Sequence, residues 1–259
     1  MSERRPERPP RTAIVTRTEW LTPHMVRVVL GGEGLTGFTA GAFTDHYVKL
    51  LFPDPATGRA ARRTYTVRRW DEVAGELTLD FVHHGDEGLA GPWAASARPG
   101  DLIQLNGPGG EFAPDPTADW HLFAGDASAL PAIAASLERV PGGSPAWAFV
   151  EIEGPDEEQK LDTPGNLTVM WLDRTAGPGG PELLTDALRE TVFPTGRVHA
   201  FVHGEATSVR GARRHLLVER GIARQELSVS GYWKRGRTED GWRTDKAQWQ
   251  QQVLADEQT

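Results

Sequence analysis

The hydrophobic pattern of the chain changes near residue 115, and this change constrains the fold more than any other feature. Before it lie six runs rich in β-branched and aromatic residues: 12–18, 24–30, 46–52, 62–70, 76–83 and 101–106. Gly, Pro and Asp turns separate these runs, as is typical of strands. They predict an antiparallel six-stranded barrel or sandwich, with a short helix at 89–97. Within the fifth run, Leu77, Leu79 and Phe81 alternate with more polar residues, which predicts one more apolar face.

Apolar runs alternate with helical patterns in the second half of the chain. The runs are 120–124, 146–152, 167–172, 199–203 and 226–231, and the helical patterns are 129–140, 181–191 and 210–220. Such alternation predicts a parallel α/β sheet. We therefore expect a β domain at 1–115 and an α/β domain at 119–259. The tail at 245–258 is a helix candidate in which Trp249 and Val253 are four residues apart, so it either packs on the body or frays.

The composition excludes several classes of protein. The 259 residues include no cysteine, which removes disulfides, zinc–thiolate sites, iron–sulfur clusters and cysteine nucleophiles. A net charge of -8 argues against a nucleic-acid binder. No apolar run approaches the ~20 residues of a membrane span, and residues 1–11 lack the apolar core of a secretory signal. We expect a cytoplasmic, monomeric protein.

Other candidate sites are weak. His83 and His84 are adjacent, but no nearby cluster of Asp and Glu residues gives metal-ligand spacing, so no metal site is predicted. No Gly-x-Ser-x-Gly nucleophile elbow is present. The acidic segment 151–158 is interpreted as a solvated loop.

The segment 62–69 has the sequence RRTYTVRR, which is unexpected in an acidic protein. On a strand, Arg63, Tyr65 and Val67 face one side, and Thr64 and Thr66 face the other. An arginine offers a planar fork to phosphate oxygens, and a tyrosine offers a flat face to a ring system. The alternative is a basic edge strand that prevents sheet-to-sheet aggregation.

The order of Arg63, Tyr65 and Thr66 on a strand of an N-terminal β domain resembles the flavin signature of the ferredoxin-reductase-like superfamily. Within it, the likeness is to the siderophore-interacting proteins, which are FAD-dependent ferric-siderophore reductases. The resemblance implies a flavin-binding barrel followed by a nucleotide-binding α/β domain. It also implies that the arginine binds the FAD pyrophosphate, that the tyrosine packs on the isoalloxazine, and that the hydroxyl residue lies near the reactive flavin nitrogen.

Three further segments are similar to motifs of that family. DFVHHG at 80–85 resembles its second flavin segment, and GYWKRG at 231–236 resembles its C-terminal signature. GLAGPWA at 88–94 resembles a helix start whose amides hold the pyrophosphate, although its proline and small residues are permuted. The cofactor-binding residues implied are Arg63, Thr64, Tyr65, Thr66, Asp80, Phe81, Val82, His83, His84, Ala90, Gly91, Pro92, Tyr232 and Trp233.

The segment GDASALPAI at 125–133 follows a short strand and is similar to the family's nicotinamide corner, with Ala-Ser where Glu-Thr is common. No Gly-x-Gly-x-x-Gly fingerprint stands at this position, and an ordinary helix start explains the residues about as well. The nicotinamide residues implied are Gly125, Asp126, Ser128 and Ala129. Arg174, Arg210 and Arg213 are candidates for a 2′-phosphate, but NADPH, NADH and a ferredoxin all stay open as the donor.

The principal hypothesis is flavin-dependent reduction of a ferric siderophore, with release of Fe(II) and with no side chain acting as a catalytic acid or base. The resemblance gives Lys49, Lys234 and Arg235 as bases that bind the substrate, although solvated surface positions would also explain them. One rival is a flavin reductase that serves an oxygenase or another protein. A second is a siderophore-binding module without turnover.

Overall fold

The computed structural model describes residues 9–53, 58, 60–177, 180 and 182–255. Pro181 and Gln258, which bound two of the predicted helices, lie outside these residues. The chain splits into two compact units, Met1–Leu21 with Met25–Glu111 (unit 1) and Thr22–His24 with Phe112–Thr259 (unit 2). The domain boundary between residues 115 and 119 stays a prediction. Within the described ranges, no helix is long and apolar enough to cross a membrane.

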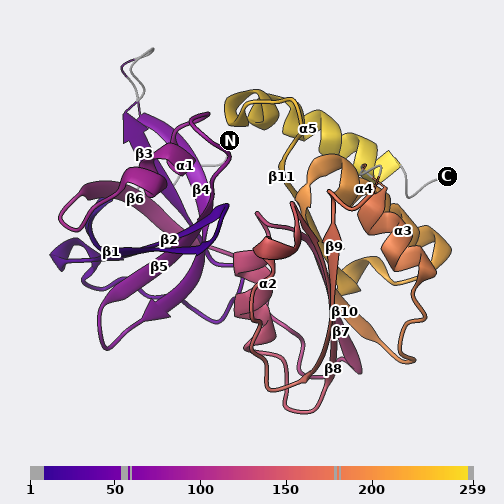
Figure 1. Ribbon diagram of the computed structural model, residues 1–259. Helices are drawn as coiled ribbons and strands as arrows, with labels where there is room; N and C mark the ends of the chain where they lie inside the picture. The colour runs from indigo at the N-terminus through magenta and orange to yellow at the C-terminus, as the bar shows by residue number, and fades with distance from the viewer. Residues whose placement is uncertain (1–8, 54–57, 59, 178–179, 181, 256–259) are drawn as a thin grey trace, which may run out of the picture. The chain divides into compact units, whose positions relative to one another are not determined.

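Unit 1 is a closed six-stranded antiparallel barrel, drawn in indigo to magenta (Figure 1). Its strands are β1 (Arg11–Thr22), β2 (Met25–Gly31), β3 (Tyr47–Pro53), β4 (Ala60–Asp71), β5 (Glu76–Val82) and β6 (Leu102–Gly109). They follow the order β1-β2-β5-β4-β3-β6, and β1 pairs with β6 to close the barrel. The 3-10 turn η1 (Glu33–Leu35) follows β2, and helix α1 (Ala90–Ser96) joins β5 to β6. The predicted barrel and its helix are confirmed.

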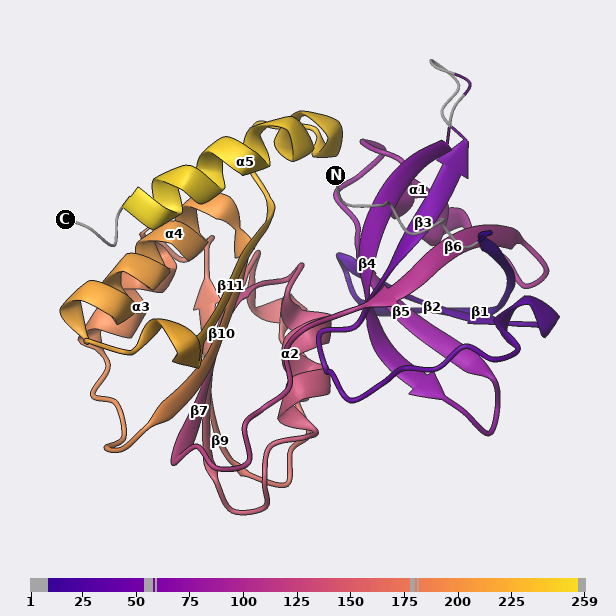
Figure 2. The same ribbon diagram turned by 180° about the vertical axis from the view of Figure 1, so that it is seen from behind.

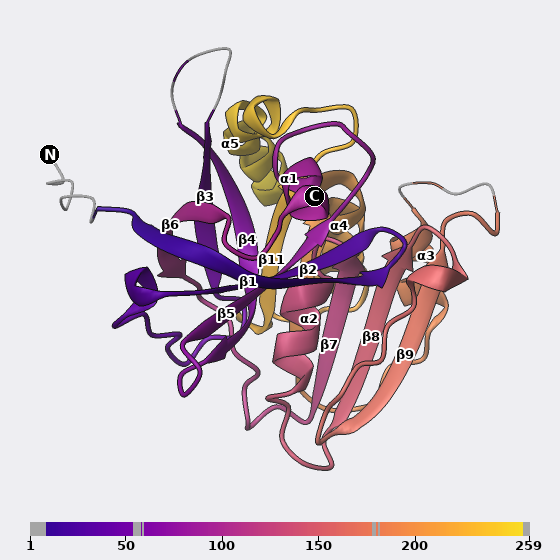
Figure 3. The same cartoon turned by 60° about the vertical axis from the view of Figure 1, so that its left-hand side comes forward.

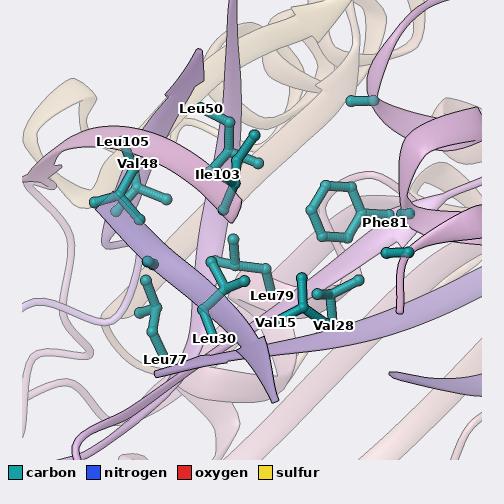
Figure 4. Close-up of a cluster of buried hydrophobic side chains, with 14 of the residues drawn as sticks. Val15, Val28, Leu30, Val48, Leu50, Leu77, Leu79, Phe81, Ile103 and Leu105 are labelled. Atoms are coloured by element: carbon teal, nitrogen blue, oxygen red, sulfur yellow. The ribbon is translucent and has the colours of Figure 1, made fainter. Parts of the chain in front are cut away.

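The barrel interior is filled by aliphatic and aromatic side chains from alternate strand positions. In Figure 4, Val28, Leu50, Leu79 and Leu105 point from four different strands into one interior. Strand β5 departs from simple alternation, because all of its residues from Leu77 to Phe81 are buried. The polar Asp80 is accommodated by Arg27, whose Nε and Nη2 donate to its two carboxylate oxygens at 2.7 and 2.8 Å.

Unit 2 is built on a five-stranded parallel sheet with the order β11-β10-β7-β8-β9. The strands are β7 (Trp120–Asp126), β8 (Pro145–Ile152), β9 (Asn166–Asp173), β10 (Val198–Glu205) and β11 (Leu227–Trp233). From the central β7 the chain passes to β8 on one side and later to β10 on the other. Ligands of such sheets bind where the strand order reverses, beyond the carboxyl ends of the strands.

Helices cover both faces of this sheet (Figures 2 and 3). Helix α2 (Leu130–Leu137) covers one face, and α3 (Leu183–Glu190), α4 (Ala206–Arg214) and α5 (Glu239–Ala255) cover the other. Shorter elements are the 3-10 turns Pro155–Glu157 and Arg224–Glu226 and the π-helical turn His215–Glu219. The predicted α/β domain is confirmed.

Two helices begin earlier than the sequence predicts. Helix α4 starts at Ala206 instead of 210, because the carboxylate of Glu205 accepts hydrogen bonds from the first-turn amides and caps the helix. Helix α5 starts at Glu239 instead of 245. Its Trp242, Trp249 and Val253 are buried in one core with α3 and α4. The tail therefore packs on the body, and the alternative of a frayed tail is wrong.

Candidate functional site

Strand β4 carries the predicted flavin residues of unit 1. The Tyr65 ring lies 4.2 Å from the Phe81 ring, at an interplanar angle of 32°. Tyr65 is partly exposed, whereas Phe81 and Val67 are fully inside the barrel core. Arg63 is half-buried, and its Nη1 donates to the Arg62 carbonyl at 3.0 Å. The Tyr65 ring thus packs against the barrel core, on the same face of β4 as the buried Val67.

The opposite side of β4 brings one predicted substrate residue to the predicted cofactor residues. In the β3–β4 ladder, Lys49 lies directly opposite Thr64, and Tyr47 lies opposite Thr66. Side chains opposite each other in an antiparallel pair point to the same side of the sheet. Lys49 and Thr64 are both exposed, while Thr66 is buried. The sequence pattern alone did not predict that Lys49 and Thr64 are cross-strand neighbours.

The end of β5 meets the start of α1. A Cβ added at Gly91 would lie 3.2 Å from the Val82 carbonyl oxygen and 3.6 Å from the Cα of His83, so the helix starts directly against the strand end. Leu89, at the N-cap position, offers no side-chain acceptor to the first-turn amides. The Trp20 ring, half-exposed on β1, stands edge-on to the His83 ring at 5.5 Å. No sequence pattern pointed to Trp20.

These residues of unit 1 fit FAD by the chemistry of their donors. FAD presents pyrophosphate oxygens, which suit an arginine fork and helix-start amides, and a flat ring, which suits a supported aromatic face. Arg63, α1 and Tyr65 supply these groups. The glycine at position 91 keeps the space between α1 and the strand end free of a side chain.

The predicted nicotinamide corner lies at the carboxyl end of β7 in unit 2. Asp126 is 5% exposed, and its Oδ1 accepts from the amide of Ser128 at 2.9 Å and from the Ser128 hydroxyl. Its Oδ2 accepts from the amide of Glu205 at 2.7 Å and from Nε1 of Trp233 at 2.8 Å. Ala129 is fully buried at the start of α2. A Cβ at Gly125 would lie 2.3 Å from the His203 carbonyl oxygen. The hydrogen bond from Trp233 to Asp126 therefore links the C-terminal signature to the predicted nicotinamide corner.

Two further buried carboxyl groups surround Asp126, and sequence reasoning missed both. Glu151 on β8 is buried, so the interpretation of residue 151 as part of a solvated loop is wrong. Burial, with the negative charge of Asp126 as the next cause, raises the pKa of Glu151 to about 7, while the charge of Arg174 opposes the shift. Glu205 ends β10 and is 3% exposed. The sequence feature that could have revealed both is an acidic residue at the end of an apolar run predicted to be a parallel strand. In the described part of the chain no three His, Asp or Glu side chains are placed to hold a metal ion.

The predicted bases of the C-terminal signature lie beside these acids. Lys234 is partly exposed and Arg235 is exposed, and the amide of Arg235 donates to Oε1 of Glu205 at 3.1 Å. A base that the sequence did not suggest is Lys246 on α5, whose Nζ lies 3.4 Å from the Ser230 hydroxyl. Burial lowers the pKa of Lys246.

The arginines that were candidates for binding a 2′-phosphate differ in burial and in their partners. Arg213 is 1% exposed and donates to the carbonyl of Val253 at 2.8 Å, so the proposal that it meets a nucleotide is wrong. Arg174 forms an ion pair with Glu153 at 3.1 Å. Tyr232 stands edge-on to the buried His203 in unit 2, and any contact of Tyr232 or Trp233 with a flavin stays a prediction.

Known proteins resemble both units. Residues 14–61 and 55–112 match the siderophore-interacting FAD-binding domain, and residues 118–236 match the siderophore-interacting protein family. More distantly, the chain shares its fold with a ferredoxin NADP+ reductase of Neisseria gonorrhoeae (TM-score 0.63, 17% identity, 86% of this chain and 98% of that one). These matches define the class as a ferredoxin-reductase-like fold, with an FAD-binding barrel domain and a parallel α/β domain.

Relatives along the whole chain define the family. The ferric vibriobactin reductase ViuB of Vibrio cholerae is 34% identical over 92% of this chain and 94% of its own length. The NADPH-dependent ferric-chelate reductase of Escherichia coli is 29% identical over 86% and 92%. The crystal structure of a siderophore utilization protein from T. fusca is 40% identical, with a TM-score of 0.80 over 89% of this chain and 95% of that one. The chain belongs to the siderophore-interacting protein family.

Proposed function

We propose that this protein is an FAD-dependent oxidoreductase that reduces the iron of a ferric siderophore and releases it as Fe(II). The observation that carries the proposal is the grouping on strands β3 and β4. There a half-buried arginine and a core-supported tyrosine share one strand, and Lys49 stands opposite Thr64 on the neighbouring strand. A cofactor site and a base for an anionic substrate would thus lie on neighbouring strands of unit 1.

The residues of unit 1 would hold the cofactor. Arg63 and the first-turn amides of α1, at Ala90 and Gly91, would bind the pyrophosphate. Tyr65 would orient the ring system, with Thr64 and Thr66 at its edge. The strand end from Val82 to His84, together with Pro92, would complete the pocket, and the buried Asp80 and Phe81 would support it from the barrel core. When bound, FAD supplies the redox chemistry: its ring can take two electrons as a hydride and pass them on one at a time.

The bases would hold the substrate. Lys49, Lys234 and Arg235 would attract an anionic ferric chelate, and Fe(II) would then leave because hard oxygen donors bind it more weakly than Fe(III). The name of the family and the names of two relatives support this substrate class. We propose a nicotinamide nucleotide as the electron donor, in keeping with the name of the E. coli relative. Gly125 and Ala129 would border its site.

Mixing the purified protein, loaded with FAD, with a ferric siderophore, NADH or NADPH and an Fe(II)-trapping chromophore tests the function. We expect the trap to colour with at least one nucleotide, in proportion to enzyme. If Fe(II) formed only when reduced ferredoxin replaced the nucleotide, the electron donor would be a ferredoxin and the proposed reductase function would stand. Bleaching of the flavin without Fe(II) would favour a reductase of another acceptor. Siderophore binding with neither reaction would leave a binding module.

A further inference from the structure

The carboxylate of Asp126 is fully engaged within the protein. A carboxylate accepts at about four lone-pair positions, and four donors already occupy those of Asp126. Two come from Ser128, one from the amide of Glu205 and one from the indole of Trp233. A nucleotide hydroxyl or amide could bond to this carboxylate only by displacing one of them.

The backbone around Asp126 is shaped for this contact. Gly204 has φ +140°, and a Cβ there would lie 2.8 Å from Oδ2 of Asp126, so only glycine leaves the carboxylate its place. The pairing of β10 with β11 shifts at the same point: Gly204 is opposite Gly231, but Glu205 is opposite Trp233. Tyr232 is therefore an extra residue, and a bulge of this kind re-aims the side chains beside it.

Glu205 holds the other side of the same segment. Its Oε2 accepts from the amides of Thr207 and Ser208 at 2.6 and 3.0 Å, and its Oε1 accepts from the amide of Arg235 at 3.1 Å. Trp233 is thus fixed through its side chain and Arg235 through its backbone. Lys234 lies between these two fixed points.

We propose that Asp126 and Glu205 are positioning residues that clamp the segment 231–236, so that the side chains of Lys234 and Arg235 form a preorganised pair for an anionic group of the ferric chelate. Asp126 then acts through Trp233 and does not contact the electron donor. The role of the two bases rests on the proposed function. Among the described residues, neither base has a carboxylate partner. Bases on a fixed backbone lose less conformational entropy when they bind a ligand.

The clamp can be tested without any substrate. In protein with 15N-labelled indoles, Trp233→Phe identifies the N–H signal of Trp233. Asp126→Asn keeps the size of the side chain but removes the charge and one pair of acceptor positions. We expect it to move the Trp233 signal to higher field and to speed its hydrogen exchange, while the buried Trp249 signal stays in place. An unmoved Trp233 signal would overturn the clamp.

Binding of the ferric complex of a tris-catecholate then tests the consequence. We expect Asp126→Asn to weaken binding roughly tenfold, the effect of losing one charge-assisted hydrogen bond. Trp233→Phe should weaken it similarly, and the double variant no further, because both remove the same contact. Additive losses, or loss of dinucleotide affinity with chelate affinity retained in Asp126→Asn, would contradict the inference. If the parent protein binds no chelate, the proposed function fails and the indole signals alone decide the clamp.

Two glycine substitutions, Gly204→Ala and Gly154→Ala, distinguish the effect of displacing the Asp126 carboxylate from the effect of backbone strain alone. Gly204→Ala should reproduce the Asp126→Asn result on the Trp233 signal. Gly154 has φ +141° and only one distant neighbour, the Thr175 hydroxyl at 4.0 Å, so Gly154→Ala carries comparable strain away from the clamp. It should leave the Trp233 signal and the chelate affinity unchanged. Equal effects of both substitutions would mean that the segment responds to general destabilisation, against the proposal.

Discussion

The two candidate regions of this protein use polar side chains in opposite ways. On the barrel, Lys49 and Thr64 are exposed, and Arg63 and Tyr65 are partly exposed along the same strands. At the carboxyl edge of the α/β sheet, Asp126, Glu151 and Glu205 are at most 5% exposed and accept hydrogen bonds from protein donors.

This difference separates groups that serve a ligand from groups that serve the chain itself. A ligand site keeps donors accessible, whereas a structural clamp satisfies its buried acceptors internally. Family motifs cover both regions and do not tell them apart. Substitutions can, because loss of a ligand group should change binding and loss of an internal group should change stability.

The largest expected effect is on stability, in unit 2. Trp249 is 6% exposed, and its Nε1 donates to the carbonyl of Ala206 at 3.0 Å. Trp249→Ala should lower the free energy of unfolding by about 3–5 kcal/mol, as for other buried aromatic truncations. Chemical denaturation followed by circular dichroism measures it. As a control, Trp20→Ala removes a half-exposed ring and should cost less than about 1 kcal/mol. Equal costs would contradict the packing of α5.

Next comes a binding effect, in unit 1. Arg63→Ala should weaken FAD binding about a hundredfold, because a charge-assisted pair to the pyrophosphate is lost. The flavin absorbance of the purified protein and its titration with FAD measure this loss, and the unfolding of the apoprotein should hardly change.

A second arginine of the same strand provides the control for Arg63. Arg69 is highly exposed and pairs with Asp71 at 3.4 Å. Arg69→Ala should keep the parent's flavin content. Should Arg63→Ala bind FAD as the parent does, the strand would be only a basic edge, as the alternative interpretation of the sequence holds.

The third effect depends on pH. Because the pKa of Glu151 is about 7 in the fold and 4.5 in its ordinary state, the native protein holds a proton there that the unfolded chain has released. Stability should therefore fall by about 2–3 kcal/mol as pH rises from about 4.5 to 7, given about 1.4 kcal/mol per pKa unit. Glu151→Gln should remove most of this fall and stabilise the protein at pH 8. Urea titrations from pH 5 to 8 measure both, and an unchanged pH dependence would contradict the assignment. Glu153→Gln, at an exposed neighbour, is the control.

Much of the fold followed from sequence periodicity. The strands of the barrel and of the sheet appear where apolar runs lie between turn residues, because burial of these runs dominates the free energy. Helix starts were less accurate, since the cap of α4 is Glu205, a residue that the pattern placed beyond a strand. Its capping role exists only because the strand ends where the helix begins.

The candidate sites were predicted less evenly. Motif order placed Arg63 and Tyr65 on one strand, but only the β3–β4 register places Lys49 opposite Thr64. Asp126 and Trp233, 107 residues apart, meet through strand order in the sheet, which periodicity does not encode. The buried state of Glu151 likewise depends on α3, whose Leu184 amide donates to it at 3.2 Å.

The smallest expected effects concern one base in each region, Lys49 in unit 1 and Lys234 in unit 2. A chain of net charge -8 repels an anionic ferric chelate at long range, so nearby bases must attract it. Lys49→Ala and Lys234→Ala should each weaken its binding about threefold to tenfold at low salt, and less at high salt, where screening acts over about 8–10 Å or shorter. Their FAD content should equal the parent's. Lys160→Ala removes an exposed lysine paired with Asp162 and is the control. Affinities that match the parent's at every salt concentration would point to a neutral substrate or to another surface, because bases that serve a ligand must act on its charge.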